Sequence, residues 1–279
     1  MDTLRLDGRL LANQIQMRLK EEIRTLPHQP HLAVVAVGDN PASTLYINMK
    51  TKVADAVGIR TSIHKMPDSS STEQMIRLIQ VLNMDPSVDG ILVQLPLPEP
   101  LDTNAIIEAI LPSKDADGLT SKNQGGLMTG YPTILPCTPL GCLRLIHQAR
   151  PILSGLNATV VGRSRLVGRP MAQLLLSENC TVAQAHTYTE NLQDICSRAD
   201  ILVSATGVAG LIKRDFVKPG AIVIDVGISK TQDGRIAGDV DTNSVMGRAG
   251  WLTPVPGGVG PMTVAMLMSN MVNIVKHEF

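Results

Sequence analysis

Two residues four positions apart, Tyr46 and Lys50, could act together on a flat substrate. They lie in the segment PASTLYINMKTK, and residues at positions i and i+4 of a helix are neighbours on one face. The tyrosine ring could stack on a heterocycle while the lysine ammonium reaches its reactive atom. A lysine acts as a base only when burial or neighbouring charge lowers its pKa. On spacing alone, a surface lysine beside a half-buried tyrosine is the simpler interpretation.

Polar residues at the ends of two connections add to this pair. Gln94 lies at the carboxyl end of the apolar run DGILVQL, where open α/β sheets place their ligands, and its amide could orient Lys50. Asp115 and Asp117 lie in the segment KDADG. One of these carboxylates could accept hydrogen bonds from the N–H edge of a ring, and an Asx turn before Gly118 is the alternative.

A glycine-containing turn, VVGRSRLVGRP (160–170), could bind a phosphorylated nucleotide. Gly162 can make a sharp turn after a strand, Gly168 allows a close backbone approach, and N–H groups at the following helix start would face a pyrophosphate. The spacing G-x-S-x-x-x-G is a variant of the standard G-x-G-x-x-G, so an ordinary strand–helix turn is the alternative. Placement in a βαβ unit of about 30 residues favours the nucleotide.

The end of the following strand favours NADP over NAD. NAD sites usually carry a carboxylate there to bind the ribose 2′-hydroxyl. This chain has the run AHTY, and Glu190 comes too late. Arg163, inside the glycine turn, supplies a cation that suits a 2′-phosphate. A solvated surface charge is the alternative for Arg163.

A second glycine-rich segment, TPVPGGVGPMT (253–263), lies between a strand-like segment and a helix. It could form another phosphate-binding loop, but it lacks the lysine of a Walker motif. We expect a loop that contacts the substrate near the nicotinamide.

Alternating strands and helices are predicted to position these residues. The predicted strands are short apolar runs at 31–38, 89–95, 157–162, 180–185, 200–205 and 221–227. The predicted helices span 41–57, 72–84, 139–148, 170–178 and 192–198. Runs that are apolar on both faces suit parallel strands covered by helices. The pattern predicts two α/β domains, the second a Rossmann-like, doubly wound parallel sheet.

The predicted boundary is the turn-rich segment GYPTILPCT (130–138). We expect one α/β domain over 1–138 and the Rossmann-like domain over 139–260. The last segment, 261–279, begins with a proline, which is favoured at the first position of a helix. This helix is expected to pack back on the first domain.

Composition narrows the class of protein. The 25 basic and 25 acidic residues cancel, which gives no support for nucleic-acid binding. The cysteines fit no zinc spacing, so no metal is expected; they are Cys137, Cys142, Cys180 and Cys196. Membrane association is not expected, because no apolar run approaches the roughly 20 residues that span a bilayer. We expect a cytoplasmic protein with reduced thiols.

Together these segments resemble the bifunctional methylenetetrahydrofolate dehydrogenase/methenyltetrahydrofolate cyclohydrolase family. The resemblance covers nearly the whole chain, through VGDNPASTLYINMK, DGILVQLPLP, KDADGLTSKN, PCTPLG, VVGRSRLVGRP, VIDVGI, GDVD and TPVPGGVGPMT. It implies NADP-dependent oxidation of 5,10-methylenetetrahydrofolate to the 5,10-methenyl form, followed by hydrolysis to 10-formyltetrahydrofolate. It further implies one shared cleft between the two domains, a homodimer through the second domain, and a place in one-carbon metabolism and purine biosynthesis.

The resemblance also implies roles for individual residues. Lys50 would be the general base and acid, and Gln94 would tune it. Tyr46 would stack on the folate, and Asp117 would bind the amino edge of the pterin. The implied cofactor contacts are Gly162, Arg163, Ser164, Thr187 and Ile228, and the implied folate-side loop contains Pro256, Gly257 and Gly258.

The chain departs from the family's pattern beside Thr187, where many members carry a basic residue. The run here is His186-Thr187-Tyr188-Thr189, which weakens the NADP affinity that we expect. Three alternatives follow: a dehydrogenase of this family without the cyclohydrolase step, a different two-domain NADP oxidoreductase for a small hydroxy or oxo acid, and a nucleotide-sensing regulator. Retention of Lys50 and Gln94 argues against the first.

Overall fold

The computed structural model describes residues 2–131, 133–230 and 234–277 and divides the chain into two compact units. The six-stranded unit contains Met1–Asn13 and Pro136–Thr263, and the three-stranded unit contains Gln14–Leu135 and Val264–Phe279. The chain therefore passes between the units three times. The two-domain α/β class predicted from the sequence is confirmed.

The three-stranded unit is built on a parallel sheet of order β3-β2-β4. Its elements are α1 (Gly8–Ile23, which begins in the other unit), β2 (His31–Val37), α2 (Pro41–Val57), β3 (Arg60–Met66), α3 (Thr72–Met84), β4 (Gly90–Val93), α4 (Thr103–Glu108), η1 (Pro112–Lys114) and α5 (Ser121–Thr129). The last helix, α10 (Val259–Lys276), enters it from residue 264.

The central strand β2 is buried on both faces. Its residues Ala33 and Val35 pack with Met75 and Ile79 of α3 in one hydrophobic cluster, and Leu32, which points to the opposite face, is also buried. This explains why β2 reads as a continuous apolar run. The predicted helices at 41–57 and 72–84 match α2 and α3.

One strand of this sheet was not predicted. β3 has the polar sequence RTSIHKM and lies at the sheet edge, paired only with β2 among the described strands. Most of its side chains are exposed or half-buried. A strand whose side chains are in contact with solvent needs no continuous apolar run, whereas β4 at the other edge is buried and apolar.

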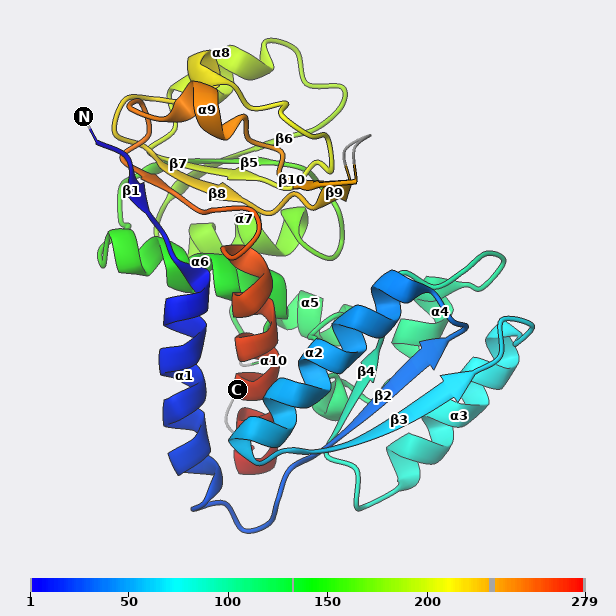
Figure 1. Ribbon diagram of the computed structural model, residues 1–279. Helices are drawn as coiled ribbons and strands as arrows, with labels where there is room; N and C mark the ends of the chain where they lie inside the picture. The colour runs from blue at the N-terminus through cyan, green and yellow to red at the C-terminus, as the bar shows by residue number, and fades with distance from the viewer. Residues whose placement is uncertain (1, 132, 231–233, 278–279) are drawn as a thin grey trace. The chain divides into compact units, whose positions relative to one another are not determined.

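The six-stranded unit has a parallel sheet of order β1-β11-β8-β7-β5-β6. Its elements are β1 (Leu4–Arg5), α6 (Cys137–Ala149), β5 (Asn157–Val161), α7 (Gly168–Ser177), β6 (Thr181–Ala185), α8 (Leu192–Ser197), β7 (Ile201–Ser204), η2 (Arg214–Phe216), β8 (Ile222–Asp225), β9 (Ser229–Lys230), β10 (Ile236–Ala237), α9 (Thr242–Val245) and β11 (Trp251–Leu252). Helices α6 and α7 cover one face, and α8 and α9 cover the other (Figure 1).

The strand order reverses at β5, because β6 lies on one side of it and β7 on the other. In open α/β sheets, ligands bind at the carboxyl ends of the strands at such a reversal. The glycine turn follows β5 directly and therefore lies at this position.

The N-terminal residues join the six-stranded sheet through β1, which pairs in parallel with β11. The first 13 residues therefore belong to the same compact unit as the later part of the chain, whereas the sequence suggested a first domain over 1–138. The pairing joins Leu4 to Trp251, which are far apart in the sequence, so no local sequence pattern predicts it. The predicted functional boundary at residue 138 stays a prediction.

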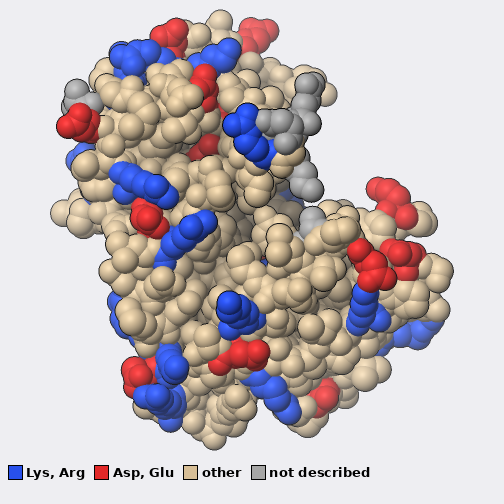
Figure 2. All heavy atoms as spheres, in the orientation of Figure 1, with Lys and Arg blue, Asp and Glu red and all other residues tan. Residues whose placement is uncertain are grey.

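Within the described ranges, no helix combines the length and apolar character that crossing a bilayer requires. Basic and acidic side chains alternate over the face drawn in Figure 2 and do not gather into one patch of a single sign. This distribution agrees with the balanced charge of the chain.

Candidate active site

The Lys50 ammonium lies against Gln94 in the three-stranded unit. Nζ of Lys50 donates to Oε1 of Gln94 at 2.9 Å. Gln94 directly follows β4, at the carboxyl edge of the sheet, and its amide nitrogen donates to the carbonyl of Leu95 at 2.7 Å. Because the amide nitrogen is held in this way, the amide oxygen faces the lysine. The fold thus brings together two residues that are 44 positions apart in the sequence.

Helix α2 positions Tyr46 and Lys50 beside its core-facing stripe. That stripe contains Ile47, Ala54 and Val57, which are buried. Tyr46 and Lys50 flank it and are half-buried. Since helix neighbours at i and i+4 share a face, the ring and the ammonium lie on the same side of α2.

The two aspartates of the KDADG segment differ in environment. Asp115 is buried, and its Oδ2 accepts hydrogen bonds from the Thr120 N–H at 2.7 Å and from Nδ2 of Asn123 at 2.9 Å. Its side chain therefore stabilises the turn into α5. Asp117 is half-exposed. Of the two carboxylates that the sequence left open, Asp117 is the accessible one.

The glycine turn after β5 requires glycine at both of its glycine positions. Gly162 has a φ of +128°, and a Cβ there would lie 2.4 Å from the carbonyl oxygen of Ala205. A Cβ on Gly168 would lie 2.3 Å from the carbonyl oxygen of Gly162. The turn is thus folded tightly onto the start of α7, which places backbone where a side chain would otherwise stand.

Ser164 stabilises this turn through its side chain. Its Oγ accepts from the Val167 N–H at 3.2 Å and from the Gly168 N–H at 3.3 Å. The backbone carbonyl of Ser164 accepts from the Arg169 N–H at 3.1 Å. Both acceptor positions of the hydroxyl are therefore used, and its hydrogen can still donate.

The remaining predicted cofactor residues are exposed around the same edge. Arg163 and Thr187 are exposed, on the turn after β5 and on the loop after β6. The guanidinium carbon of Arg163 lies 5.6 Å from the centroid of the Tyr188 ring. The sequence had marked Tyr188 only as a departure from the family's pattern.

Ile228 follows β8 and is 54% exposed, and the buried carboxyl of Asp225 supports the loop that carries it. Asp225 Oδ1 accepts from the N–H groups of Gly227 and Asp239, each at 2.9 Å, and its Oδ2 accepts from the Val240 N–H at 2.9 Å. Burial raises the pKa of Asp225 to about 6, against the opposing effect of these three N–H groups. Sequence analysis did not single out Asp225, because its contacts come from residues up to 15 positions away.

The loop with Pro256, Gly257 and Gly258 lies in the six-stranded unit. Gly257 has a φ of +108°, and a Cβ on Gly258 would lie 2.7 Å from the carbonyl oxygen of Pro254. Both glycines are buried and Pro256 is exposed. Packing alone accounts for the two glycines, and a substrate contact by this loop stays a prediction.

Two family models match the chain. Residues 136–279 match the NAD(P)-binding domain of tetrahydrofolate dehydrogenase/cyclohydrolase, and residues 6–117 match its catalytic domain. The chain belongs to the tetrahydrofolate dehydrogenase/cyclohydrolase family. The resemblance inferred from the sequence motifs is confirmed.

Members of the dehydrogenase/cyclohydrolase family match this chain over its whole length. The bifunctional protein FolD of Campylobacter curvus is 47% identical over 276 residues, which cover 98% of this chain and 96% of the relative. The crystal structure of the bifunctional enzyme FolD from Campylobacter jejuni has a TM-score of 0.96 at 42% identity and covers 99% of both chains. The FolD enzyme of Trypanosoma brucei, in complex with NADP cofactor and inhibitor, has a TM-score of 0.93 at 35% identity and covers 99% of this chain and 98% of its own.

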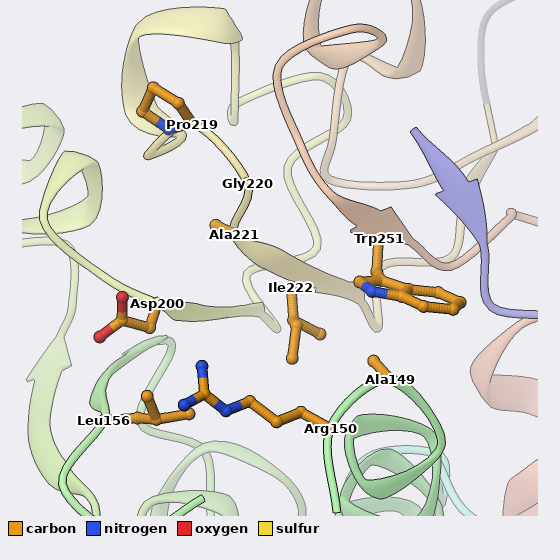
Figure 3. Close-up of a pocket in the computed structure, with 9 residues that line it drawn as sticks. All are labelled: Ala149, Arg150, Leu156, Asp200, Pro219, Gly220, Ala221, Ile222 and Trp251. Carbon is orange, nitrogen blue, oxygen red and sulfur yellow. The ribbon is translucent and has the colours of Figure 1, made fainter. Parts of the chain in front are cut away.

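This dehydrogenase/cyclohydrolase family member also has a cavity of about 190 Å³ at the amino edge of the six-stranded sheet (Figure 3). Arg150, Asp200 and Trp251 line it together with backbone near the start of β8. Nζ of Lys218 donates a hydrogen bond to Oδ1 of Asp200 at 2.6 Å. No predicted site residue lines this cavity, and the glycine turn lies at the opposite, carboxyl edge. We therefore place the dehydrogenase/cyclohydrolase chemistry elsewhere.

Metal ligands and reactive thiols are not a feature of the described part of this family member. No group of three or more His, Cys, Asp or Glu side chains in that part is arranged to hold a metal ion. All four cysteines are buried, and none of them forms a disulfide within the described ranges. Burial raises the pKa of the Cys196 thiol to about 12 and also raises that of Cys142.

Proposed function

We propose that this chain oxidises 5,10-methylenetetrahydrofolate with NADP to the 5,10-methenyl form and hydrolyses that product to 10-formyltetrahydrofolate. Relatives that match nearly the full length of the chain include the bifunctional FolD proteins of Campylobacter curvus and Campylobacter jejuni. One observation carries the proposal to this chain: the Lys50 ammonium is hydrogen-bonded at 2.9 Å to Gln94 at the carboxyl edge of a parallel sheet. A surface lysine beside a tyrosine would need no such partner.

The six-stranded unit fits a dinucleotide at the turn after β5. Gly162 and Gly168 allow the turn to fold tightly onto the start of α7, at the reversal of strand order where open α/β sheets bind their ligands. Ser164 can donate its hydroxyl hydrogen to a phosphate oxygen. Arg163 and Thr187 are exposed at the edge where a 2′-phosphate would be recognised. NADP, when bound, accepts the hydride from the one-carbon bridge of the folate.

The three-stranded unit is proposed to hold the folate. Tyr46 supplies an aromatic face that can stack on the substrate, on the same side of α2 as Lys50. The half-exposed Asp117 carboxylate can accept hydrogen bonds from the amino edge of the pterin. These contacts would hold the substrate so that its one-carbon bridge faces the lysine, and such positioning supplies a large part of an enzyme's rate.

Lys50 is proposed to move protons during the hydrolysis. The methenyl carbon of the substrate carries positive charge, which disfavours a protonated lysine beside it. Neutral Lys50 accepts a proton from water as the water oxygen bonds to the methenyl carbon. The bond between that carbon and N5 then breaks, and N5 takes from Lys50 the proton that the lysine accepted. The hydroxyl group on the carbon loses its own proton to solvent as the formyl C=O forms, so one proton is released overall. Gln94 holds the lysine nitrogen at the required place throughout.

A paired assay of Lys50→Met and Lys52→Met tests this proposal. Lys52 is exposed on the same helix and serves as the matched control. Formation of NADPH and of methenyltetrahydrofolate is followed together by absorbance. General acid–base catalysis contributes about 10²- to 10⁴-fold. We expect Lys50→Met to lose hydrolysis by a factor in this range, and Lys52→Met to hydrolyse at the wild-type rate.

The outcomes separate the remaining alternatives. Wild-type hydrolysis by Lys50→Met would remove the lysine from the mechanism. Accumulation of the methenyl product by the wild-type enzyme would identify a dehydrogenase without the second step. Reduction of NADP with a small hydroxy acid and none with the folate would identify a different oxidoreductase.

The further expectations from the sequence extend this proposal. We propose that residues 1–138 with 261–279 form the folate-binding part and 139–260 the NADP-binding part, and that both steps use one shared cleft. We also propose a cytoplasmic homodimer that serves purine biosynthesis and has no nucleic-acid or membrane partner. Light scattering on the purified chain tests the dimer, because a monomeric mass would exclude it.

A further inference from the structure

Tyr188 is one of three tyrosines in the chain and is 78% exposed. It lies on the loop after β6, and the guanidinium carbon of Arg163 lies 5.6 Å from its ring centroid. This is within the distance of about 6 Å at which an aromatic face attracts a cation. The exposed Tyr188 ring therefore has a cation–π contact with Arg163.

The turn that carries Arg163 is held from two neighbouring elements. Nε2 of Gln184, on β6, donates to the carbonyl of Gly162 at 3.1 Å. Nε of Arg169, on α7, donates to the carbonyl of Arg163 itself at 3.2 Å. The backbone from which the Arg163 side chain starts is thus tied to both the strand and the helix beside it.

The loop that carries Tyr188 is also closed by its own hydrogen bonds. The His186 N–H donates to Oγ1 of Thr189 at 2.8 Å, and the Thr189 N–H donates to the carbonyl of His186 at 2.8 Å. The Tyr188 N–H donates to Nδ1 of His186 at 3.2 Å. The His186 and Tyr188 rings form a T-shaped contact, with centroids 6.1 Å apart. The His186 ring therefore supports the tyrosine ring, over which the Arg163 guanidinium lies.

This contact lies where dinucleotide enzymes distinguish NADP from NAD. That choice is made at the carboxyl end of the second strand of the βαβ unit, which is β6 in this chain. No carboxylate stands in the run Ala185–Thr189 to bind a ribose 2′-hydroxyl. Within the described ranges, the cation that contacts an aromatic ring of this loop is Arg163.

We propose that Tyr188 is a specificity-determining residue, whose ring holds the Arg163 guanidinium in place to receive the 2′-phosphate of NADP. A guanidinium stacked on a ring keeps its N–H edges available for two-point binding of a phosphate. A guanidinium that is already positioned also loses less conformational freedom when the phosphate binds. Tyr188 thus acts as a positioning residue through Arg163. The inference rests on the proposed function, because it requires NADP as the cofactor.

The test measures dissociation constants for NADP⁺ and NAD⁺ by calorimetry, without turnover. Cation–π contacts at exposed sites correspond to about a two- to fivefold change in an equilibrium constant. Tyr188→Leu should therefore weaken NADP⁺ binding by about two- to fivefold and leave NAD⁺ binding unchanged. Tyr188→Phe keeps the ring and is the matched control, so both constants should stay at the wild-type values.

A double-mutant cycle with Arg163→Gln shows whether Tyr188 acts through the arginine. In the Arg163→Gln background, Tyr188→Leu should have no further effect on NADP⁺ binding. An undiminished effect in that background would overturn the inference, as would equal weakening of both dinucleotides or wild-type binding by Tyr188→Leu. A wild-type enzyme that shows the expected selectivity but does not turn over the folate would overturn the proposed function and leave this inference standing.

Discussion

The same added methyl group should have opposite effects at two glycines of this chain, Gly168 and Gly125. Gly168 is the first residue of α7, and Gly125 is an exposed residue in the middle of α5. A Cβ on Gly168 would meet backbone atoms at 2.3, 2.5 and 2.8 Å, whereas a Cβ on Gly125 would meet nothing within 4 Å. The surroundings of each glycine, not the chemistry of the substitution, should therefore decide whether the added methyl group stabilises or destabilises the protein.

For Gly168→Ala the structure sets the size of the effect. Ordinary van der Waals contact begins near 3.4 Å, so the Gly162 carbonyl must move by about 1 Å (3.4 − 2.3). Overpacking of this kind costs about 1–3 kcal/mol of stability. The moved backbone belongs to the proposed nucleotide-binding turn, and a misplacement of about 1 Å in a catalytic arrangement can cost on the order of 10²-fold in rate. We expect loss of stability together with a large loss of kcat/KM for NADP.

For Gly125→Ala the expected change is a gain. An alanine is favoured over glycine by about 0.5–1 kcal/mol inside a helix, because it restricts the unfolded chain more. Gly125 has no left-handed φ that would oppose the substitution. Activity with NADP should be unchanged.

Urea denaturation and NADP titration of both variants check this prediction. A Gly168→Ala enzyme with wild-type stability and wild-type NADP binding would refute the argument from the close backbone approach. Destabilisation of Gly125→Ala to a similar extent would show that the described surroundings do not control the effect.

Two further predictions concern buried ionisable groups. Because the folded-state pKa of Asp225 is about 6 and its ordinary value is 3.8, the folded protein holds a proton that the unfolded chain has lost between these pH values. The associated stability is present below about pH 4 and is lost as the pH rises through about 6, by at most about 3 kcal/mol for a pKa that changes from 3.8 to about 6. The free energy of unfolding of Asp225→Asn, measured by denaturation from pH 4 to 7, should lack this pH-dependent contribution. An identical change of the unfolding free energy with pH in both proteins would contradict the prediction. Because burial raises the thiol pKa of Cys142 and Cys196, the native enzyme should react with a disulfide reagent far more slowly than the unfolded chain, in which four thiols are counted. Fast labelling of the native protein would show that these thiols are accessible.

The elements with local signals could be predicted from the sequence. β2 is recognisable as a continuous apolar run, because both of its faces are buried. The start of α3 is marked by a capping box, in which the Ser71 side chain accepts from the Gln74 N–H and the Gln74 side chain accepts from the Ser71 N–H. These signals depend on residues a few positions apart, so they are visible without the fold.

Elements that depend on distant partners could not be predicted in this way. β3 has no apolar run because its side chains are exposed or half-buried, and β1 is only two residues long and is stabilised by its pairing with β11. Helix α1 was not predicted, because its sequence GRLLANQIQMRLKEEI mixes polar and apolar residues and contains no long apolar run. Such elements are stabilised by packing and pairing rather than by local preference.

The same division holds for the candidate site. The sequence by itself determined the Tyr46/Lys50 spacing, the glycines of the turn and the absence of a carboxylate from the run 185–189, since these are properties of neighbouring residues. Only the tertiary structure decided that Gln94 accepts a hydrogen bond from Lys50 and that the buried Asp115 accepts one from the Thr120 N–H. It also decided that the Tyr188 ring faces Arg163. The physical reason is that a hydrogen bond or a ring contact acts over a few ångströms in space, and only the folded chain brings residues that are 25 or 44 positions apart within that reach.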